Sequence, residues 1–206
     1  MILAFDTATK FCSVALYIGG EYWEKSDPAP NGHAARLMPM IDEILQEAGR
    51  AIQQVDEIVV SLGPGSFTGL RIGISTALGL ASALDIPVYG VSSLQARSYL
   101  NEKTVCPLID ARRDRVYAAC YGDFHFEEAN LPFEEFLEVI HNQSVVFTGE
   151  GIEEFADRAG VRVVENTQYA KGAIQAYLAG VYRTDITPRY LRMTQAEAEA
   201  KGIDSP

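Results

Sequence analysis

The stretch GPGSFTGLRIG, from Gly63 to Gly73, joins a strongly apolar segment, Ile58–Leu62, to a long helix-forming segment, Phe67–Leu84. This order predicts a glycine-rich turn that leads from a buried strand into a helix. Turns of this kind are common sites for anions, because backbone N–H groups at the start of a helix point toward the bound group.

The same stretch departs from both common phosphate-binding templates. A P-loop has Lys and then Ser or Thr after its second glycine, whereas Leu70 and Arg71 follow Gly69. A dinucleotide-binding turn needs glycine at the position of Thr68. The spacing leaves two interpretations open, a phosphate site or a tight turn with close helix packing, and it favours the second.

Around this turn, short apolar segments alternate with segments of helical spacing. Residues 1–102 predict three strands joined by tight turns, then helices and strands in alternation. The predicted strands are Ile2–Asp6, Phe11–Ile18, Glu21–Lys25, Ile58–Leu62 and Val88–Val91, and the helices are His33–Ala48, Phe67–Leu84 and Leu94–Leu100.

Residues 103–206 repeat that order. Asp6 and Asp110 each end the first strand of a half, and the Gly63-Pro64-Gly65 turn has a counterpart in Gly149-Glu150-Gly151. Such a repeat predicts a duplicated actin-like α/β fold (ASKHA, or ribonuclease H-like), with mixed sheets and two domains, 1–102 and 103–206. From Thr184 we expect an irregular tail with a short helical stretch around Gln195–Lys201. Further predicted strands are Val105–Ile109, Val116–Tyr121, Phe124–Phe126, Val145–Thr148 and Val161–Val164, and further helices are Phe133–Ile140, Ile152–Ala159 and Ala173–Tyr182.

The helix that follows the glycine-rich turn has Arg71 as its only charge between Leu70 and Leu84. A helix that is apolar on all sides is expected to be buried on all sides. The neighbouring helix could cover part of it and a second protein chain the remainder, although the monomer alone could also cover it. The predicted partner-interface residues are Leu37, Ile41, Ile44, Gly69, Gly73, Ala77 and Leu80.

The turn Asp6-Thr7-Ala8-Thr9 closes the first predicted hairpin. In actin-like ATPases an aspartate at this place helps to position magnesium and phosphate. The turn has the acid and two hydroxyl groups but no glycine, so its backbone could not approach a phosphate closely. The candidate cofactor-binding residues are Asp6, Thr7, Thr9, Gly63 and Gly65.

Neither catalytic residues nor metal ligands are predicted. His33 begins a predicted helix, but the residue four positions further on is Leu37, and metal-binding His pairs commonly have that spacing. No Ser, Cys or Thr stands in a recognisable nucleophile context with a matched base. Cys12, Cys106 and Cys120 lie in apolar segments and are expected to be buried free thiols in a reducing compartment.

The net charge of −11 makes the chain by itself a poor binder of RNA. Its first residues lack the basic region of a signal peptide, and the weakly charged segment Leu70–Leu84 is too short to cross a bilayer. These features predict a soluble, cytoplasmic protein with no membrane partner.

Several of these segments together resemble the TsaB (YeaZ) family, over nearly the whole chain. The most specific is Gly63–Gly73. The others are Leu3–Thr9, His33–Ile41, Ser92–Leu94, Asp110–Arg113 with Val116-Tyr117, and Pro188–Arg192.

The resemblance implies an actin-like fold with a reduced second half. It implies a non-catalytic subunit that supports a paralogue, TsaD, in transferring threonylcarbamoyl to adenosine 37 of tRNA. The expected partners are TsaD in a heterodimer, a second copy in a homodimer, and a TsaE-type ATPase on the heterodimer, with tRNA contacted only through the complex. No intrinsic cofactor is expected, although ATP or ADP could bind at the partner interface.

Two departures from the catalytic paralogue agree with that role. Leu37 stands where the paralogue has the second His of a metal-binding pair, and its adenosine loop is reduced to Gly149-Glu150-Gly151. The competing interpretations are a small ATP-dependent kinase or ATPase, and a glycoprotease-type peptidase. The first requires a working phosphate turn and adenosine loop, and the second a metal pair or a nucleophile.

Overall fold

The first sheet of the computed structural model, which describes residues 1–29 and 32–191, has five strands in the order β3-β2-β1-β4-β5. The first three strands pair antiparallel, and β4 and β5 continue in parallel from β1. The central strand β1 is buried along its whole length, as its apolar run before Asp6 predicts for a strand covered on both faces. The strands are β1 Ile2–Asp6, β2 Cys12–Ile18, β3 Glu21–Asp27, β4 Glu57–Ser61 and β5 Val88–Val91.

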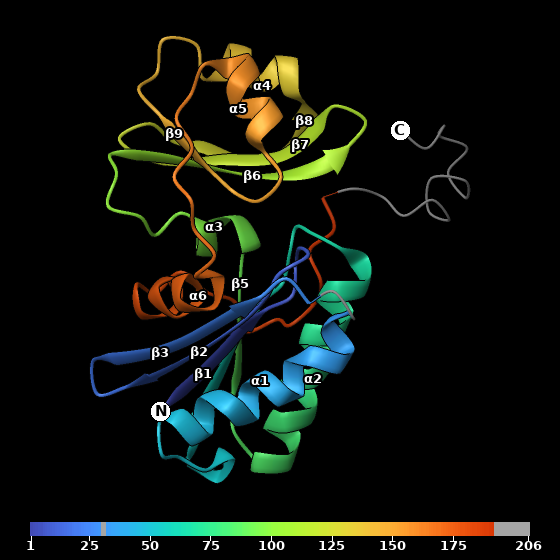
Figure 1. The fold of residues 1–206 in the computed structure, drawn as a ribbon, viewed down its shortest axis with the longest axis vertical. Coiled ribbons are helices and arrows are strands. Elements are labelled where there is room, and N and C mark those ends of the chain that lie inside the picture. Colours follow the sequence, from blue (N-terminus) through green and yellow to red (C-terminus); the bar gives the residue numbers. More distant parts are fainter. Residues whose placement is uncertain (30–31, 192–206) are drawn as a thin grey trace.

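Helices cover both faces of this sheet (Figure 1). Alternate strand residues point to opposite faces, so Leu3 and Phe5 pack under α1 (His33–Glu47) and α2 (Phe67–Leu84), whereas Ile2 and Ala4 pack against α6 (Tyr169–Leu178). α6 lies within residues 103–206, which the sequence predicts to form the second domain. The division at 102/103 therefore separates the two sheets along the chain but not the packed units, because burial of the second face of the first sheet requires a helix from the later half.

The second sheet has the order β8-β7-β6-β9, which repeats the arrangement of the first four strands of the first sheet. α4 and α5 cover its outer face, and α3 lies between the two halves (Figure 1). The predicted strand Val161–Val164 is limited to one bridge between Phe147 and Val163. The elements are α3 Ser93–Arg97, β6 Thr104–Arg112, β7 Arg115–Gly122, β8 Phe126–Pro132, α4 Phe133–Val139, β9 Val146–Thr148 and α5 Glu153–Ala159, with a 3₁₀ turn, η1, at Ile52–Gln54 in the first half.

After α6 the chain runs back along the first half without regular structure as far as Leu191. Arg183 pairs with Gly90 at the outer edge of β5, and the ring of Tyr190 stacks on Phe67 at 4.4 Å between centroids. The described part of the tail is thus irregular, as predicted. Arg192 and the predicted helical stretch Gln195–Lys201 lie outside the described residues.

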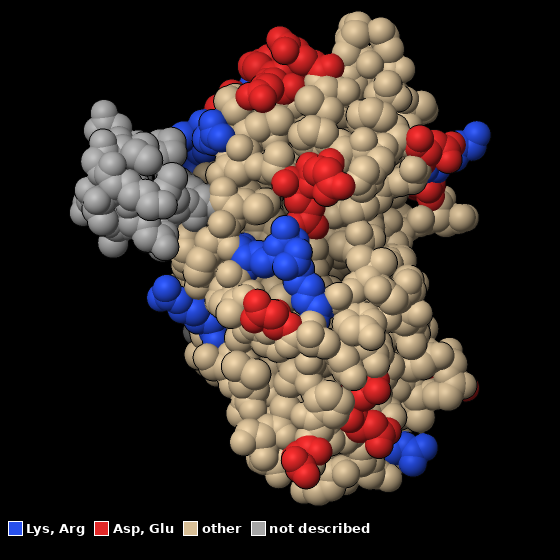
Figure 2. Space-filling model, turned by 180° about the vertical axis from the view of Figure 1, so that it is seen from behind, with Lys and Arg blue, Asp and Glu red and all other residues tan. Residues whose placement is uncertain are grey.

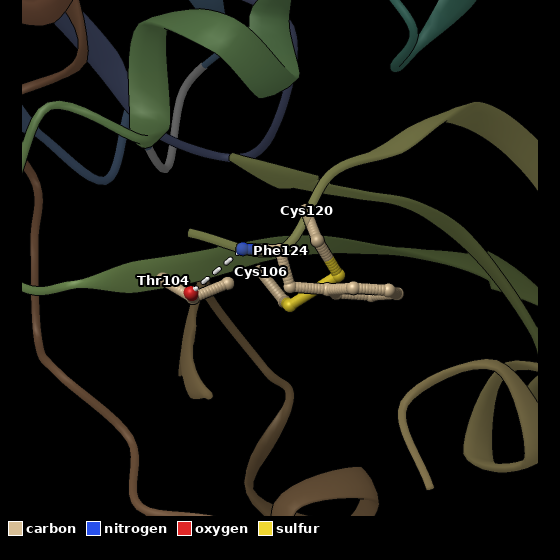
Figure 3. Close-up of a disulfide and its surroundings, with 4 residues drawn as sticks. All are labelled: Thr104, Cys106, Cys120 and Phe124. Atoms are coloured by element: carbon tan, nitrogen blue, oxygen red, sulfur yellow. Dashed lines mark hydrogen bonds between the residues drawn. A yellow bond between two sulfur atoms is a disulfide. The ribbon is translucent and has the colours of Figure 1, made fainter. Parts of the chain in front are cut away.

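Cys106 on β6 and Cys120 on β7 form a disulfide (Figure 3). The expectation of three free thiols is wrong for this pair, and Cys12 remains free and buried. The two residues face each other because the antiparallel register places Val105 opposite Tyr121. The ring of Phe124 lies alongside the sulfur atoms, and its N–H donates to Thr104 Oγ1 at 3.3 Å.

Loss of this disulfide should lower the free energy of unfolding by about 3 kcal/mol, because the bond restricts the unfolded chain across a loop of 14 residues. We expect the Cys106→Ala/Cys120→Ala double variant to unfold at lower denaturant concentration than the wild type. A reductant should lower the midpoint of the wild type and leave that of the double variant unchanged. An unchanged wild-type midpoint in reductant would contradict the prediction.

A buried carboxylate lies on the edge strand β3. Both carboxylate oxygens of Glu24 are buried, and within the described residues neither makes a hydrogen bond of ordinary geometry. Burial raises the pKa of Glu24 to about 7, while Lys171 on α6 acts in the opposite direction. A charged group that points inward on an edge strand disfavours pairing with further strands.

Protonation of Glu24 should therefore stabilise the folded state. The folded chain binds this proton more tightly than the unfolded chain, in which the pKa is near the ordinary 4.5. The contribution is complete below pH 4.5 and is lost as the pH rises through about 7. We expect Glu24→Gln to raise the melting temperature relative to wild type at pH 8 and much less at pH 5. Glu21→Gln, at an exposed position of the same strand, should show no such pH-dependent difference.

Candidate functional site

The turn after β1 lies at the junction of the two halves, where it meets an arginine from α3. Arg97 donates from Nη1 to Asp6 Oδ2 at 3.1 Å and from Nη2 to Asp6 Oδ1 at 3.3 Å. Both side chains are completely buried. Asp6 also makes a hydrogen bond within its own turn, in which Oδ1 accepts from the N–H of Ala8 at 3.0 Å.

Further contacts hold the buried guanidinium in place. Arg97 donates to the carbonyl oxygen of Ser93 at 2.7 Å and to Thr9 Oγ1 at 3.3 Å. Its guanidinium carbon lies 3.8 Å from the ring centroid of Tyr169 on α6. Burial is the largest single influence and lowers the pKa of Arg97, but the charge and hydrogen bond of Asp6, together with the charges of Tyr169 and Glu150, outweigh it, so that the pKa is raised.

A second carboxylate reaches the same turn from the other half of the chain. Glu150, in the turn after β9, accepts from Thr9 Oγ1 at 2.7 Å and from the N–H of Lys10 at 3.1 Å. The ammonium group of Lys10 lies 4.0 Å from this carboxylate, and the Glu150 side chain is only 12% exposed. Two of the candidate residues, Asp6 and Thr9, therefore lie in one site. The other two residues of this site, Arg97 and Glu150, were not predicted as site residues from the sequence.

The glycines of the Gly63–Gly73 stretch allow α2 to pack against this turn. A Cβ atom at Gly65 would collide with the carbonyl oxygen of Ala8, and one at Gly69 with that of Thr7. Thr7 Oγ1 donates to the carbonyl oxygen of Gly69 at 2.7 Å. These contacts favour close packing over an anion cradle at this stretch.

The remaining cofactor candidate, Gly63, lies apart from Asp6 and Thr9. A Cβ atom there would come within 2.6 Å of the carbonyl oxygen of Arg189, in the segment that follows α6. The N–H of Arg189 in turn donates to the carbonyl oxygen of Leu62 at 2.7 Å. Gly63 therefore allows the returning chain to approach β4.

Most of the predicted partner-interface residues belong to the core of the chain itself. The one exception among the seven is Leu80, which is partly buried and packs against the same core. The apolar spacing selected the stripe that faces the first sheet, so these positions need correction as candidates for contact with another chain. The six buried residues are Leu37, Ile41, Ile44, Gly69, Gly73 and Ala77.

The surfaces of α1 and α2 that point away from the sheet carry other residues. Met38 on α1 and Leu78 on α2 are large apolar side chains with 41% and 46% of their area exposed. Gly79 is also exposed, and nothing lies within 4 Å of where its Cβ would be. We call Met38, Leu78 and Gly79 the outer helix face.

The histidine considered for metal binding takes part in the junction instead. His33 Nε2 lies 2.7 Å from the carbonyl oxygen of Thr9. Within residues 1–29 and 32–191 there is no group of three or more His, Cys, Asp or Glu that could hold a metal ion.

Two sheets of matching strand order place the chain among actin-like α/β proteins. A family model described as "TsaD: tRNA N6-adenosine threonylcarbamoyltransferase" matches residues 27–177. Three relatives carry the name "tRNA threonylcarbamoyladenosine biosynthesis protein TsaB". The chain belongs to this TsaB (YeaZ) family, as the sequence motifs indicated.

The similarity to these relatives varies in extent. The Bacillus subtilis protein is 31% identical, over 99% of this chain and 98% of its own length. The Escherichia coli protein is 37% identical, over 73% of this chain and 69% of its own length. The Haemophilus influenzae protein is 41% identical, over 66% of this chain and 59% of its own length.

Solved structures agree with this assignment. "YeaZ from Pseudomonas aeruginosa" is 33% identical, with a TM-score of 0.75 over 92% of this chain and 99% of that chain. A second structure, titled as an uncharacterized protein with similarity to peptidase YEAZ from the same organism, has a TM-score of 0.77 at 33% identity, over 93% of this chain and 99% of that chain.

The buried pair of Arg97 and Asp6 should dominate the stability of the junction. We expect Asp6→Ala to lower the free energy of unfolding by about 3–5 kcal/mol, because it leaves a buried guanidinium without its counter-charge. Asp6→Ala combined with Arg97→Met should cost less than the sum of the single changes. Glu102→Ala, which breaks a more exposed pair with Arg162, serves as the control and should cost much less in denaturant unfolding.

Proposed function

We propose that this protein is a non-catalytic subunit in the synthesis of threonylcarbamoyladenosine on tRNA. In this role it supports a TsaD-type paralogue, which transfers the threonylcarbamoyl group to adenosine 37. The names of its relatives support the biosynthetic role. The observation that carries the non-catalytic part is the occupation of the junction by the side chains of Arg97 and Glu150.

The contacts at the junction explain why this proposal is preferred over an ATPase. A nucleotide-hydrolysing site of this fold needs its first aspartate free for a hydrated metal and its turn free for phosphate. Here Arg97 binds both oxygens of Asp6, and Glu150 takes the donors of Thr9 and Lys10. We also interpret the four-stranded second sheet as a reduced copy of the five-stranded first.

The outer helix face is the surface that we propose for the partner. α2 is long and apolar enough to pass as a membrane span on length and composition, yet only 33% of that window is buried in the chain. Its exposed positions after Arg71 carry no charge until the helix ends, whereas a solvated helix face normally carries several. Figure 2 shows a broad expanse of uncharged side chains over the left part of the lower half of the molecule, with charged groups toward the bottom and the right.

Gly79 adds a reason to expect another helix at this face. An exposed glycine within a helix costs about 1 kcal/mol relative to alanine, and no neighbour among the described residues requires it. A missing side chain lets a second helix approach closely. We propose that this face binds the TsaD-type paralogue, and a second copy of this chain in a homodimer when the paralogue is absent.

The remaining partners follow from that arrangement. A TsaE-type ATPase would dock on the heterodimer, ATP or ADP could bind at the partner interface, and tRNA would be held mainly by the other subunits in the cytoplasm. An acidic chain is suited to this division of tasks, since its net charge of −11 repels a phosphate backbone.

Reconstitution tests the proposed function. The purified chain would be mixed with its TsaD-type paralogue, the TsaE-type ATPase and a threonylcarbamoyl donor, and modified adenosine would be measured by mass spectrometry. Transfer should require both paralogues, and the chain alone should show neither ATP turnover nor peptidase activity. Turnover by the chain alone that survives repurification and is lost in Thr9→Val would instead support an ATPase.

The outer helix face is tested by charge. Leu78→Glu or Gly79→Glu should fold normally, because both positions are exposed, but should prevent pairing with the paralogue, because an unpaired charge would be buried at a cost of several kcal/mol. Light scattering would measure the complex. Leu178→Glu, at an exposed apolar position on the opposite side of the first sheet, is the matched control.

The same variants test whether the homodimer and the heterodimer share the face. Wild-type homodimers should release monomers when the paralogue is added, and Leu78→Glu should weaken both assemblies. Folded variants that still pair normally would place the interface elsewhere.

A further inference from the structure

The turn formed by Thr9 and Lys10 directs its hydrogen-bond donors at a single carboxylate. Thr9 Oγ1 lies 2.7 Å from one oxygen of Glu150, the N–H of Lys10 lies 3.1 Å from the other, and the Lys10 ammonium is 4.0 Å away. Two oxygens of a phosphate can accept from such a set of donors in the same way. The position of Glu150 is therefore that of an anion bound to the turn.

We propose that Glu150 is the internal ligand of an anion site formed by Thr9, Lys10 and Arg97, and that its carboxylate excludes a phosphate-type oxyanion from that site. The proposal goes beyond the role in tRNA modification and does not depend on it, because it concerns the isolated chain. The contact joins residues 141 positions apart in the sequence, so that Glu150 reaches the anion site only after the two halves have come together.

The charges around the turn support an anion site once Glu150 is removed. Asp6 and Glu150 balance Arg97 and Lys10 in the folded chain. Without Glu150 the group has one excess positive charge. Lys10 is exposed, but Arg97 is completely buried, and the attraction of an anion to a buried charge is stronger than to one at the surface. Asp6 does not repel an incoming anion strongly, because both of its oxygens are paired with Arg97.

Two buried polar atoms beside the turn have no hydrogen-bond partner among residues 1–29 and 32–191. These are Arg97 Nε and the hydroxyl oxygen of Tyr169, whose side chains are completely buried. Burial first, and then the charges of Glu150 and Asp6 against that of Arg97, raise the pKa of Tyr169 to about 12. Tyr169 therefore keeps its proton at neutral pH and adds an unused donor beside Arg97.

The backbone around Glu150 permits its side chain to withdraw. Glu150 stands between two glycines with positive φ, 150° at Gly149 and 68° at Gly151. Gly149 is packed closely, since a Cβ there would collide with the carbonyl oxygen of Leu108, whereas nothing lies within 4 Å of a Cβ at Gly151. The strand end is thus fixed while the far side of the turn has free space.

Binding of inorganic phosphate to the isolated chain tests the proposal. We expect Glu150→Ala to bind phosphate at least tenfold more tightly than the wild type in titration calorimetry at constant ionic strength. Glu150→Gln should also gain affinity, because its amide removes the negative charge with little change of shape. Phosphate should raise the melting temperature of both variants more than chloride does.

Two further variants separate a built site from a general effect of charge. Glu153→Ala removes an exposed carboxylate from the same segment and should gain no affinity. Adding Thr9→Val to Glu150→Gln should remove most of the gain, because a donor is lost. The proposal is overturned if folded Glu150→Gln binds phosphate no better than the wild type, or if Glu153→Ala gains as much.

Discussion

The ion pair between Arg97 and Asp6 is the interaction on which the junction of the two halves depends. Both charges are removed from water, so donors and acceptors that they leave unmatched are costly, and most of them have partners within the chain. The matches come from the turn after β1, from α3 and from the ring of Tyr169 on α6. α6 is thereby held on the first sheet although it follows the second sheet in the chain.

Occupation of the junction changes what such a fold can contribute. Side chains of the chain itself form hydrogen bonds with the turn, so few of its donors and acceptors remain for a cofactor. Binding of a partner would then take place on the surface of the molecule. Glu150 has a particular place here, because it is the contact that the second half makes with the donors of the turn. One carboxylate thus links the two halves and determines whether an anion can reach the turn.

α2 serves the core on one side and remains uncharged on the other. Gly69 and Gly73 bring its inner side against Thr7, whereas Leu78 and Gly79 face outward. The apolar outer side explains why no clear amphipathic pattern marks the helix. The strongest apolar spacing identified the buried stripe, and the surface suited to a partner lies on the remaining positions.

Local patterns were sufficient for much of this protein. Periodicity and turn residues predicted the order of strands and helices and the duplication, because these features depend on neighbours within a few residues. The family was indicated by the resemblance of several short motifs, which are also local. The pairing of Cys106 with Cys120, the return of α6 to the first sheet, and the roles of Arg97 and Glu150 were decided only by the tertiary structure. Arg97 lies 91 residues from Asp6, and Glu150 lies 141 from Thr9. Contacts over such separations depend on sheet register and packing, which no local spacing of residue types records.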